Sequence, residues 1–274
     1  MSPETRQVEA DPFYFGSAAE PLFGLHYPPT SGPAREAGIV LCYPIGHEYI
    51  VAHRAYRQLS IRLAAAGFHV LRFDYHATGD SAGDCERGAP PRWLADISTA
   101  IGELRRRSAC GAVTLVGCRL GATLAALVGA ERGDVERMVL WDPVVNGKDH
   151  VGEISQRHQD MLRRTQVVSR LGADRAGERE LLGFAMTDTA LDEIEALDLM
   201  AMSRGPATNL LVVNSQAGDA TAPWRAHVAR AGTIVTYDPI PVPRAWTWIE
   251  DPATILVPNQ ILGAIVAWLA QVRS

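Results

Sequence analysis

The chain has 274 residues, of which 47% are hydrophobic and 21% charged, and its formal net charge is −5. This size and composition are typical of a soluble globular protein with one large domain or a domain with an insertion. The acidic balance argues against nucleic acid and anionic membranes as partners, and no apolar run reaches the roughly 18 residues that span a bilayer.

The predicted elements alternate between short apolar runs and longer helical patterns, which is typical of a mainly parallel α/β sheet. In chain order they are strand 38–42, helix 53–66, strand 68–74, helix 93–107, strand 113–116, helix 122–131, strands 135–141, 209–213 and 233–237, and helix 259–272. Residues 27–38 and the stretch HATGDSAGD are predicted to be loops, because they are rich in turn-forming residues.

The segment 146–205 is mixed, helical in character and rich in charge. Since it separates two strand-rich parts, we expect a helical cap at 146–205 over a core made of residues 1–145 and 206–274. Such a cap would cover the carboxyl ends of the strands, where open α/β sheets bind ligands.

The cysteines give no sign of a metal site or of disulfides. Cys42, Cys85, Cys110 and Cys118 lack a CxxC or Cys/His spacing, and the first residues, MSPETRQVEADP, are polar and unlike a signal peptide. We therefore expect free thiols and a cytoplasmic protein. Neither a P-loop nor a dinucleotide fingerprint is present, so the sequence predicts no metal and no cofactor.

Four stretches, in the right order, carry a resemblance to a known family. They are LCYPIGHEY, LAAAGFHVLRFDYHATGDSAGD, VTLVGCRLGATLA and MVLWDPVVNG. With them the chain resembles the α/β-hydrolase superfamily, most closely the serine-aminopeptidase-like branch that includes hydrolases associated with exosortase systems. The resemblance implies the α/β-hydrolase fold, a doubly wound, mainly parallel sheet with a helical cap insertion. It also implies an oxyanion loop at LCYPIGHEY and a nucleophile elbow at GCRLG.

The predicted elbow departs from the family's Gly-x-Ser-x-Gly pattern, since it reads Gly117-Cys118-Arg119-Leu120-Gly121. The turn needs small residues on either side of its strained centre, so the two glycines are expected to serve the backbone. The central side chain, Arg119, is expected to project into the site.

A second member of the family's triad is also absent from its expected place. The triad histidine follows the last strand, but the last histidine of this chain, His227, precedes it. The loop expected to hold it carries Trp246 and Trp248 instead, which would either wall an apolar pocket or fill the space. Asp219 stands where the triad acid would be, without its histidine. Hydrolysis by the standard triad is therefore not expected.

Arg119 has two alternative roles. Its guanidinium could bind a carboxylate, a phosphate or a developing oxyanion of a ligand. It could equally form an internal ion pair, with Asp142, Glu48 or Asp74 as the partner. Of these, Asp142 ends a predicted strand on the side of the site, whereas Asp74 and its neighbour Asp80 are expected to cap turns.

The predicted oxyanion loop offers further candidates. His47 and Glu48 are possible acid–base groups overlooking the pocket, or else part of an ordered loop packed by tyrosines. Cys118 is a possible thiolate nucleophile, or else a small buried core residue. The residues expected to line the substrate site are Tyr43, Ile45, Gly46, Leu120, Trp246 and Trp248.

These features leave three functional hypotheses open. The first is an α/β-hydrolase-fold enzyme of metabolite biosynthesis that acts on a small acyl, ester or thioester-like metabolite, free or carrier-bound, by acid–base chemistry. Its reaction would be hydrolysis, cyclisation or elimination. The second is a catalytically silent protein that binds a ligand or a partner. The third is a thiol hydrolase or acyltransferase that uses Cys118. The substrate and the oligomeric state do not follow from the sequence.

Overall fold

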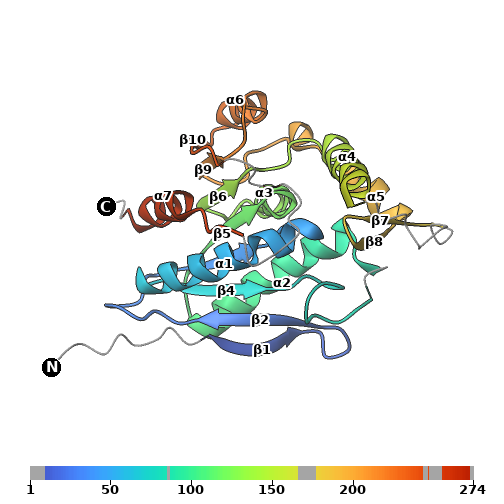
Figure 1. Cartoon of the computed structure of the whole chain (residues 1–274). Helices are drawn as coiled ribbons and strands as arrows, with labels where there is room; N and C mark the ends of the chain where they lie inside the picture. The colour runs from blue at the N-terminus through green and yellow to red at the C-terminus, as the bar shows by residue number, and fades with distance from the viewer. Residues whose placement is uncertain (1–9, 85–86, 166–176, 243–245, 247–254, 272–274) are drawn as a thin grey trace.

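The computed structural model describes residues 10–84, 87–165, 177–242, 246 and 255–271, and these form an eight-stranded sheet with helices on both faces (Figure 1). The strand order is β1-β2-β4-β3-β5-β6-β9-β10. The strands are β1 (Asp11–Gly16), β2 (Pro21–Tyr27), β3 (Ala37–Cys42), β4 (His69–Phe73), β5 (Ala112–Cys118), β6 (Arg137–Trp141), β9 (Asn209–Asn214) and β10 (Ile234–Pro239). From β4 to β10 all neighbours are parallel, whereas β1–β2 and β2–β4 pair antiparallel.

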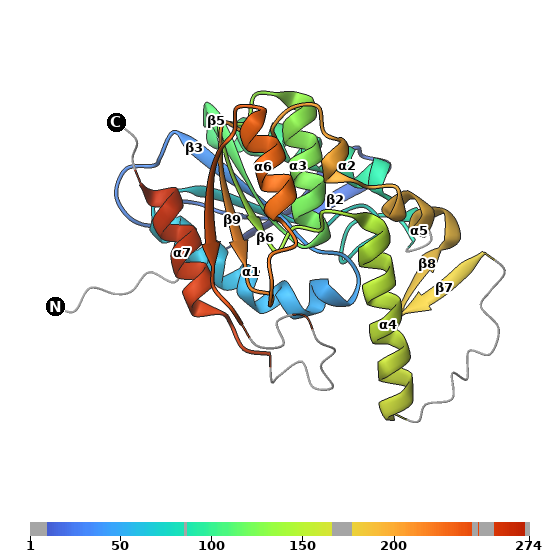
Figure 2. The same cartoon turned by 90° about the horizontal axis from the view of Figure 1, so that it is seen from above.

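The central strands are apolar runs because both of their faces are covered. Ile39, Val40 and Leu41 of β3 are fully buried, as parallel strands between two helical layers must be. Helices α1 (His47–Ala65) and α7 (Asn259–Ala270) cover one face, and α2 (Pro90–Ser108), α3 (Leu120–Arg132) and α6 (Ala222–Arg230) cover the other (Figure 2). This arrangement confirms the predicted α/β-hydrolase type of fold.

Helix α1 begins earlier than the sequence predicts. It starts at His47 rather than at His53, directly after Gly46, whose φ of 63° turns the chain out of the sheet. Pro44 and Gly46 suggest a longer loop, yet the left-handed glycine completes the turn at once. The groups that the sequence assigns to a loop, His47 and Glu48, therefore lie in the first helical turn.

The N-terminal hairpin β1–β2 is missing from the sequence prediction. Along β2, Leu22 is buried on one face while Phe23 and Leu25 are half-buried on the other, so both faces carry apolar residues. A strand covered on both sides shows no simple alternation of apolar and polar residues, which is the usual signal for a strand.

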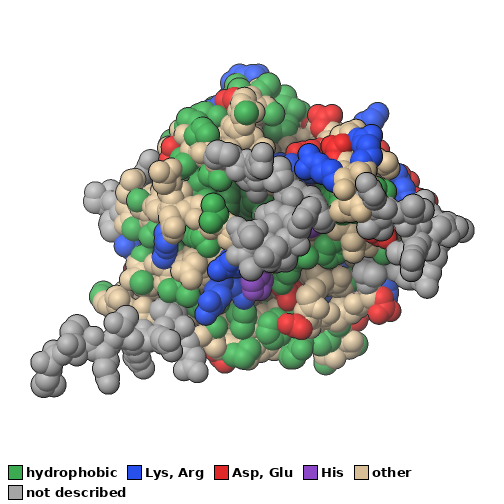
Figure 3. Space-filling model, in the orientation of Figure 1, with side chains coloured by type: hydrophobic (Ala, Val, Ile, Leu, Met, Phe, Trp, Pro, Cys, Tyr) green, Lys and Arg blue, Asp and Glu red, His purple; other side chains and the backbone are tan. Residues whose placement is uncertain are grey.

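The segment between β6 and β9 contains both helices and strands. It holds α4 (Gly147–Thr165), the hairpin of β7 (Glu178–Leu181) and β8 (Phe184–Thr187), α5 (Asp188–Glu195) and the short 3-10 helix η2 (Leu199–Ala201). We call this segment, residues 146–205, the insertion. Its helix α4 lies beside the first turns of α1 (Figure 2), and acidic and basic side chains lie together over it (Figure 3). The sequence predicts the helices but not the hairpin.

Within the described part of the chain, no helix combines the length and the apolar composition that crossing a membrane requires.

Candidate functional site

The turn between β5 and α3 places Arg119 above the carboxyl end of the sheet. Arg119 has φ 52° and ψ −124°, and its backbone N–H donates to Trp141 O on the neighbouring strand β6. A Cβ on Gly121 would lie 2.0 Å from Tyr43 O, and one on Gly117 would lie 2.5 Å from the Cα of Ala122. Both glycines therefore allow a close backbone approach that no other residue permits, as the sequence predicts.

Arg119 is bound by two carboxylates. Its Nε donates to Glu48 Oε1 at 2.9 Å, and its Nη2 donates to Glu153 Oε2 at 2.6 Å. Arg157 binds the same two groups, with Nη1 3.2 Å from Glu48 Oε1 and Nη2 2.5 Å from Glu153 Oε1. We call these four side chains the ion cluster. It joins the elbow and α1 to α4 of the insertion, and its charges cancel.

Within the ion cluster the Arg119–Glu48 pair is shielded from water, whereas the side chain of Glu153 is 39% exposed. The side chains of Arg119 and Glu48 are 7% and 3% exposed. Burial disfavours the charged guanidinium, but the two carboxylates more than compensate, and the pKa of Arg119 is raised. One carboxylate oxygen, Glu48 Oε2, is buried without a hydrogen-bond partner among the described residues.

His150 on α4 completes the surroundings of the guanidinium. Its Nδ1 lies 3.5 Å from Arg119 Nη2, and because an arginine only donates, Nδ1 is the acceptor in this contact. Burial, followed by the charge of Arg119, lowers the pKa of His150 to about 3, so its ring is neutral at pH 7.

Asp142 does not pair with Arg119, contrary to one of the predicted alternatives. Its Oδ1 accepts from Ser215 N at 2.6 Å, and its Oδ2 accepts from the Ser215 hydroxyl and from Trp246 Nε1, the latter at 2.6 Å. Gln216 Nε2 lies 3.5 Å from the same oxygen. The carboxylate is therefore satisfied by neutral donors, and the Trp246 ring lies between it and Arg119, 5.7 Å from the guanidinium carbon.

Two further carboxylates also bind elsewhere, namely Asp74, a candidate partner of Arg119, and Asp219, the expected triad acid. Asp74 accepts from the Tyr49 hydroxyl at 3.0 Å and from Asp80 N at 3.1 Å, which is the turn-capping role that the sequence predicts for it. Asp219 pairs with Arg225 on α6. Of the three carboxylates considered for Arg119, Glu48 is the one that binds it.

The thiol of Cys118 lies in the core. It is fully buried, and burial, followed by the nearby carboxylates Asp142 and Glu48, raises its pKa well above the usual range. A thiolate is the reactive form, so this environment opposes nucleophilic chemistry. His47 is partly buried, and burial lowers its pKa.

A small cavity borders the ion cluster, and a larger cavity adjoins the small one. The smaller, of about 20 Å³, has room for about one water molecule and is lined by Glu48, Leu120 and His150, among others. The larger, of about 390 Å³, shares Ile45 and Gly46 with it.

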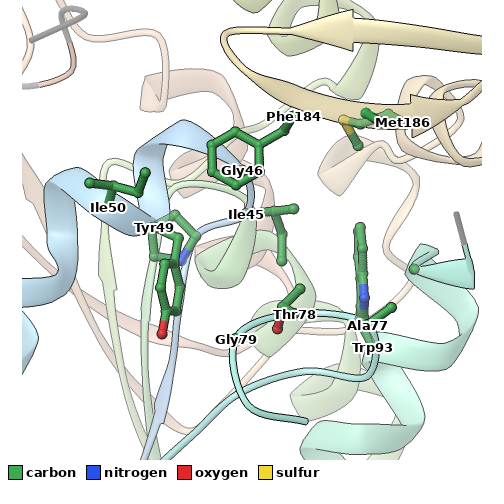
Figure 4. A pocket seen from close by; sticks show the side chains of 13 residues that line it. Ile45, Gly46, Tyr49, Ile50, Ala77, Thr78, Gly79, Trp93, Phe184 and Met186 are labelled. Carbon is green, nitrogen blue, oxygen red and sulfur yellow. The ribbon is translucent and has the colours of Figure 1, made fainter. Parts of the chain in front are cut away.

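The larger cavity, which we call the apolar cavity, is formed by four parts of the chain (Figure 4). Ile45 and Tyr49 come from the start of α1 and the turn before it, Thr78 from the loop after β4, and Trp93 from α2. From the other side, β8 of the insertion adds three further residues, namely Phe184, Ala185 and Met186. None of the described residues that line this cavity is charged.

The structure separates the residues that the sequence groups together as substrate-binding. Ile45, Gly46 and Leu120 line the cavities, whereas Tyr43 lies in the core beneath them, 1% exposed. Trp246 is buried beside Arg119. Trp248 lies outside the described residues.

The sequence analysis does not predict that side chains of α4 contact Arg119 and Glu48. His150, Glu153 and Arg157 follow one another at spacings of three and four, which places them on one face of a helix. This spacing indicates a charged helix face. However, many solvated helices have such a face, and the spacing does not reveal which residues lie opposite.

Comparison with known proteins agrees with this geometry. The sequence profile of the serine aminopeptidase family (S33) matches residues 40–208. A comparison with curated protein sequences finds no match.

In the described residues, no group of three or more His, Cys, Asp and Glu side chains is suited to hold a metal ion.

Among solved structures, three similar ones cover nearly the whole chain. The esterase Pf2001 of Pyrococcus furiosus has a TM-score of 0.67 at 12% identity, with 96% of this chain and 90% of that chain covered. Est1E of Butyrivibrio proteoclasticus with bound ferulic acid has a TM-score of 0.60 at 15% identity, covering 94% and 97%. Mouse α/β hydrolase domain-containing protein 10 has a TM-score of 0.56 at 16% identity, covering 95% and 97%. At these identities the likeness concerns the fold.

Proposed function

The chain belongs to the serine aminopeptidase (S33) family of α/β-hydrolases, and from this premise we propose that it binds a small, uncharged, largely apolar acyl compound without hydrolysing it by a covalent mechanism. The observation that carries this proposal is the pairing of a filled elbow with an open apolar cavity next to it.

The filled elbow supports the absence of covalent chemistry. Acyl transfer needs a nucleophile, a base in contact with it and space above both for the acyl carbon. Here the central side chain is a guanidinium held by Glu48 and Glu153, and the space beside it is about 20 Å³. The neighbouring ring is an indole, whose nitrogen donates a proton but cannot accept one.

The apolar cavity supports ligand binding. Its volume of about 390 Å³ lies within the range of small-molecule sites, which are mostly apolar with a few polar groups. Thr78 and Tyr49 are hydroxyl-bearing residues of its wall, and none of the described lining residues brings a charge to a ligand there. A charged molecule would lose its hydration without compensation, so the lining favours a neutral ester or another neutral acyl compound.

Two similar structures are compatible with a ligand of this class. One is an esterase, and another has bound ferulic acid, an aromatic acid. Since the described lining of the apolar cavity contains no cationic group, we favour the ester form of such molecules over the free acid.

The experiment uses 4-nitrophenyl butyrate as a neutral ester. We expect it to displace the neutral fluorescent dye Prodan from the protein, while the release of 4-nitrophenolate stays at the buffer rate. The variant Met186→Trp, which places an indole in the apolar cavity that the Met186 side chain faces (Figure 4), should abolish dye binding. The variant Ala229→Trp on the exposed face of α6 is the matched control and should bind like the unchanged protein. Hydrolysis well above the buffer rate that is lost in Arg119→Ala or Cys118→Ser would overturn the proposal.

A second candidate function rests on Glu48 Oε2, which is buried and unpartnered beside the small cavity. A carboxylate oxygen in that position is available as a general base for a non-covalent reaction of a bound ligand. If a turnover is found for any ester, its loss in Glu48→Gln, with Cys118→Ser still active, supports this function. Retained turnover in Glu48→Gln excludes it.

A further inference from the structure

A third cavity, of about 260 Å³, lies on the face of the sheet that α1 covers. Residues of two strands and one helix line it, at spacings that place their side chains on the same side. Arg72 and Asp74 at the end of β4 are two residues apart and so point to the same face, and Leu25 of β2 is the cross-strand partner of Arg72. Tyr49 and His53 are one helical turn apart on α1 and face these strands. We call this cavity the polar cavity.

The guanidinium of Arg72 is the unusual feature of this cavity. Its residue is 7% exposed, and its Nη1 is buried with no hydrogen-bond partner among the described residues. It forms no ion pair with a described carboxylate, and instead its guanidinium carbon lies 6.0 Å from the ring of Tyr27 and 5.8 Å from that of Tyr43. Burying a cation without a counter-ion is costly, so the cavity lacks one negative group at this position.

The nearby carboxylate of Asp74 does not meet that need. It is already used by the Tyr49 hydroxyl and by the backbone N–H of Asp80. Burial raises the pKa of Asp74, although these hydrogen bonds and Arg72 oppose the rise. The missing negative group must therefore come from outside the described chain.

The rest of the lining indicates what else the ligand carries. Asp80 is exposed at the cavity, and its carboxylate forms no ion pair among the described residues. Phe23 and Leu25 of β2 add an apolar wall. Burial, followed by Arg72, lowers the pKa of His53, so its ring is neutral at neutral pH and offers one N–H donor.

We propose that the polar cavity binds a small zwitterion with an apolar body, of the amino-acid class. Its carboxylate binds the guanidinium of Arg72 and the ring N–H of His53, its cationic group lies toward Asp80, and its apolar part packs on Phe23 and Leu25. In this arrangement the buried cation Arg72 binds the negative group of the ligand, and the exposed anion Asp80 lies near its positive group.

The test measures binding of leucine to the full chain by titration calorimetry. Two analogues serve as matched probes, since 4-methylpentanoate lacks the ammonium group and 3-methylbutylamine lacks the carboxylate. We expect saturable binding of leucine and affinities lower by about tenfold or more for both analogues, because each loses a charge-assisted contact. Equal affinities for the three compounds, or no binding of leucine at millimolar concentrations, would overturn the proposal.

Substitutions locate the binding. In Arg72→Met and in Asp80→Asn the affinity for leucine should fall by about tenfold, whereas Arg230→Gln, which removes a charge from the exposed face of α6, should leave it unchanged. Because Arg72 is buried, the Arg72→Met variant can fail to fold. The affinity of Asp80→Asn for leucine is an independent measurement, since Asp80 is exposed. Unchanged leucine binding in Asp80→Asn contradicts the proposal. So does loss of leucine binding in Met186→Trp, since that variant fills the apolar cavity.

Discussion

Trp246 Nε1 donates a hydrogen bond of 2.6 Å to Asp142 Oδ2, so the carboxylate at the end of β6 holds an indole ring. In a Ser-His-Asp triad the acid holds an imidazole in the same manner, and the imidazole in turn contacts the nucleophile. Here the ring that Asp142 orients lies 5.7 Å from the guanidinium carbon of Arg119. The three side chains thus keep the order acid, ring and elbow residue while lacking both a base and a nucleophile.

This relationship predicts that hydrolysis can be built into the protein with two substitutions. In Arg119→Ser/Trp246→His, Asp142 should orient the new imidazole, and removal of the guanidinium opens space at the elbow. We expect the double variant to hydrolyse 4-nitrophenyl butyrate about tenfold or more faster than either single variant, because nucleophile and base act as a unit. The release of 4-nitrophenolate measures the rate.

Thermal unfolding of all three proteins provides the control for folding. If Arg119→Ser alone hydrolyses the ester as fast as the double variant, the ring position is not that of a catalytic base, and the assignment of Trp246 to the place of the histidine is wrong.

The local parts of this site could be predicted from the sequence. The strand–turn–helix around Arg119 follows from Gly117 and Gly121, which a strained turn requires, and the structure places both against backbone atoms. The loss of the triad histidine follows from the position of His227 before the last strand. Each of these inferences depends on residues that are close in sequence.

The long-range parts could not be predicted. Arg119 lies 34 residues from Glu153 and 71 from Glu48, and the sequence offers several carboxylates at comparable separations. The choice depends on how α4 packs against α1. Likewise Asp142 binds Ser215 because β6 and β9 are neighbours in the sheet, which is a property of the topology and not of a motif.

A second prediction concerns the stability that the ion cluster provides. Arg119→Met leaves the buried carboxylate of Glu48 with Arg157 as its remaining cation. Loss of one partner from a buried ion pair costs about 3–5 kcal/mol, and urea unfolding should show a loss of that order. The control is Arg163→Met, which removes an exposed pair with Asp160 and should cost about 0–1 kcal/mol. Similar losses in the two variants would mean that the ion cluster is dispensable for folding.

A third prediction follows from His150. Its pKa of about 3 in the folded protein lies below its usual value of 6.5, so between these values the unfolded chain binds a proton that the folded chain does not. Stability therefore falls as the pH decreases through this window, with a limiting slope of about 1.4 kcal/mol per pH unit for one proton. In His150→Gln the fall between about pH 6.5 and about pH 4 should be shallower than in the unchanged protein.

The control for this pH dependence is Thr123→Val, which removes the buried hydrogen bond from the Thr123 hydroxyl to Val144 O without removing a titrating group. It should lower the free energy of unfolding by a similar amount at both ends of the window. Because other buried groups also titrate, the difference between variant and unchanged protein is the quantity to compare. An identical slope in His150→Gln would show that this histidine is not held neutral by the fold.

The fourth prediction tests the close approach at the elbow. In Gly121→Ala the new Cβ would lie 2.0 Å from Tyr43 O and 2.5 Å from Cys42 O, both of them backbone atoms of the neighbouring segment. Neither atom can move without a shift of β3 or of the turn after it. We therefore expect the free energy of unfolding to fall by about 3 kcal/mol or more, or the protein not to fold.

Gly102→Ala is the matched control, because Gly102 lies within α2 and a Cβ there meets no atom within 4 Å. That substitution should stabilise the protein by about 0.5–1 kcal/mol, since alanine favours the helix more than glycine does. Urea unfolding of both variants measures the difference, and a Gly121→Ala variant as stable as Gly102→Ala would contradict the contact between the elbow and the end of β3.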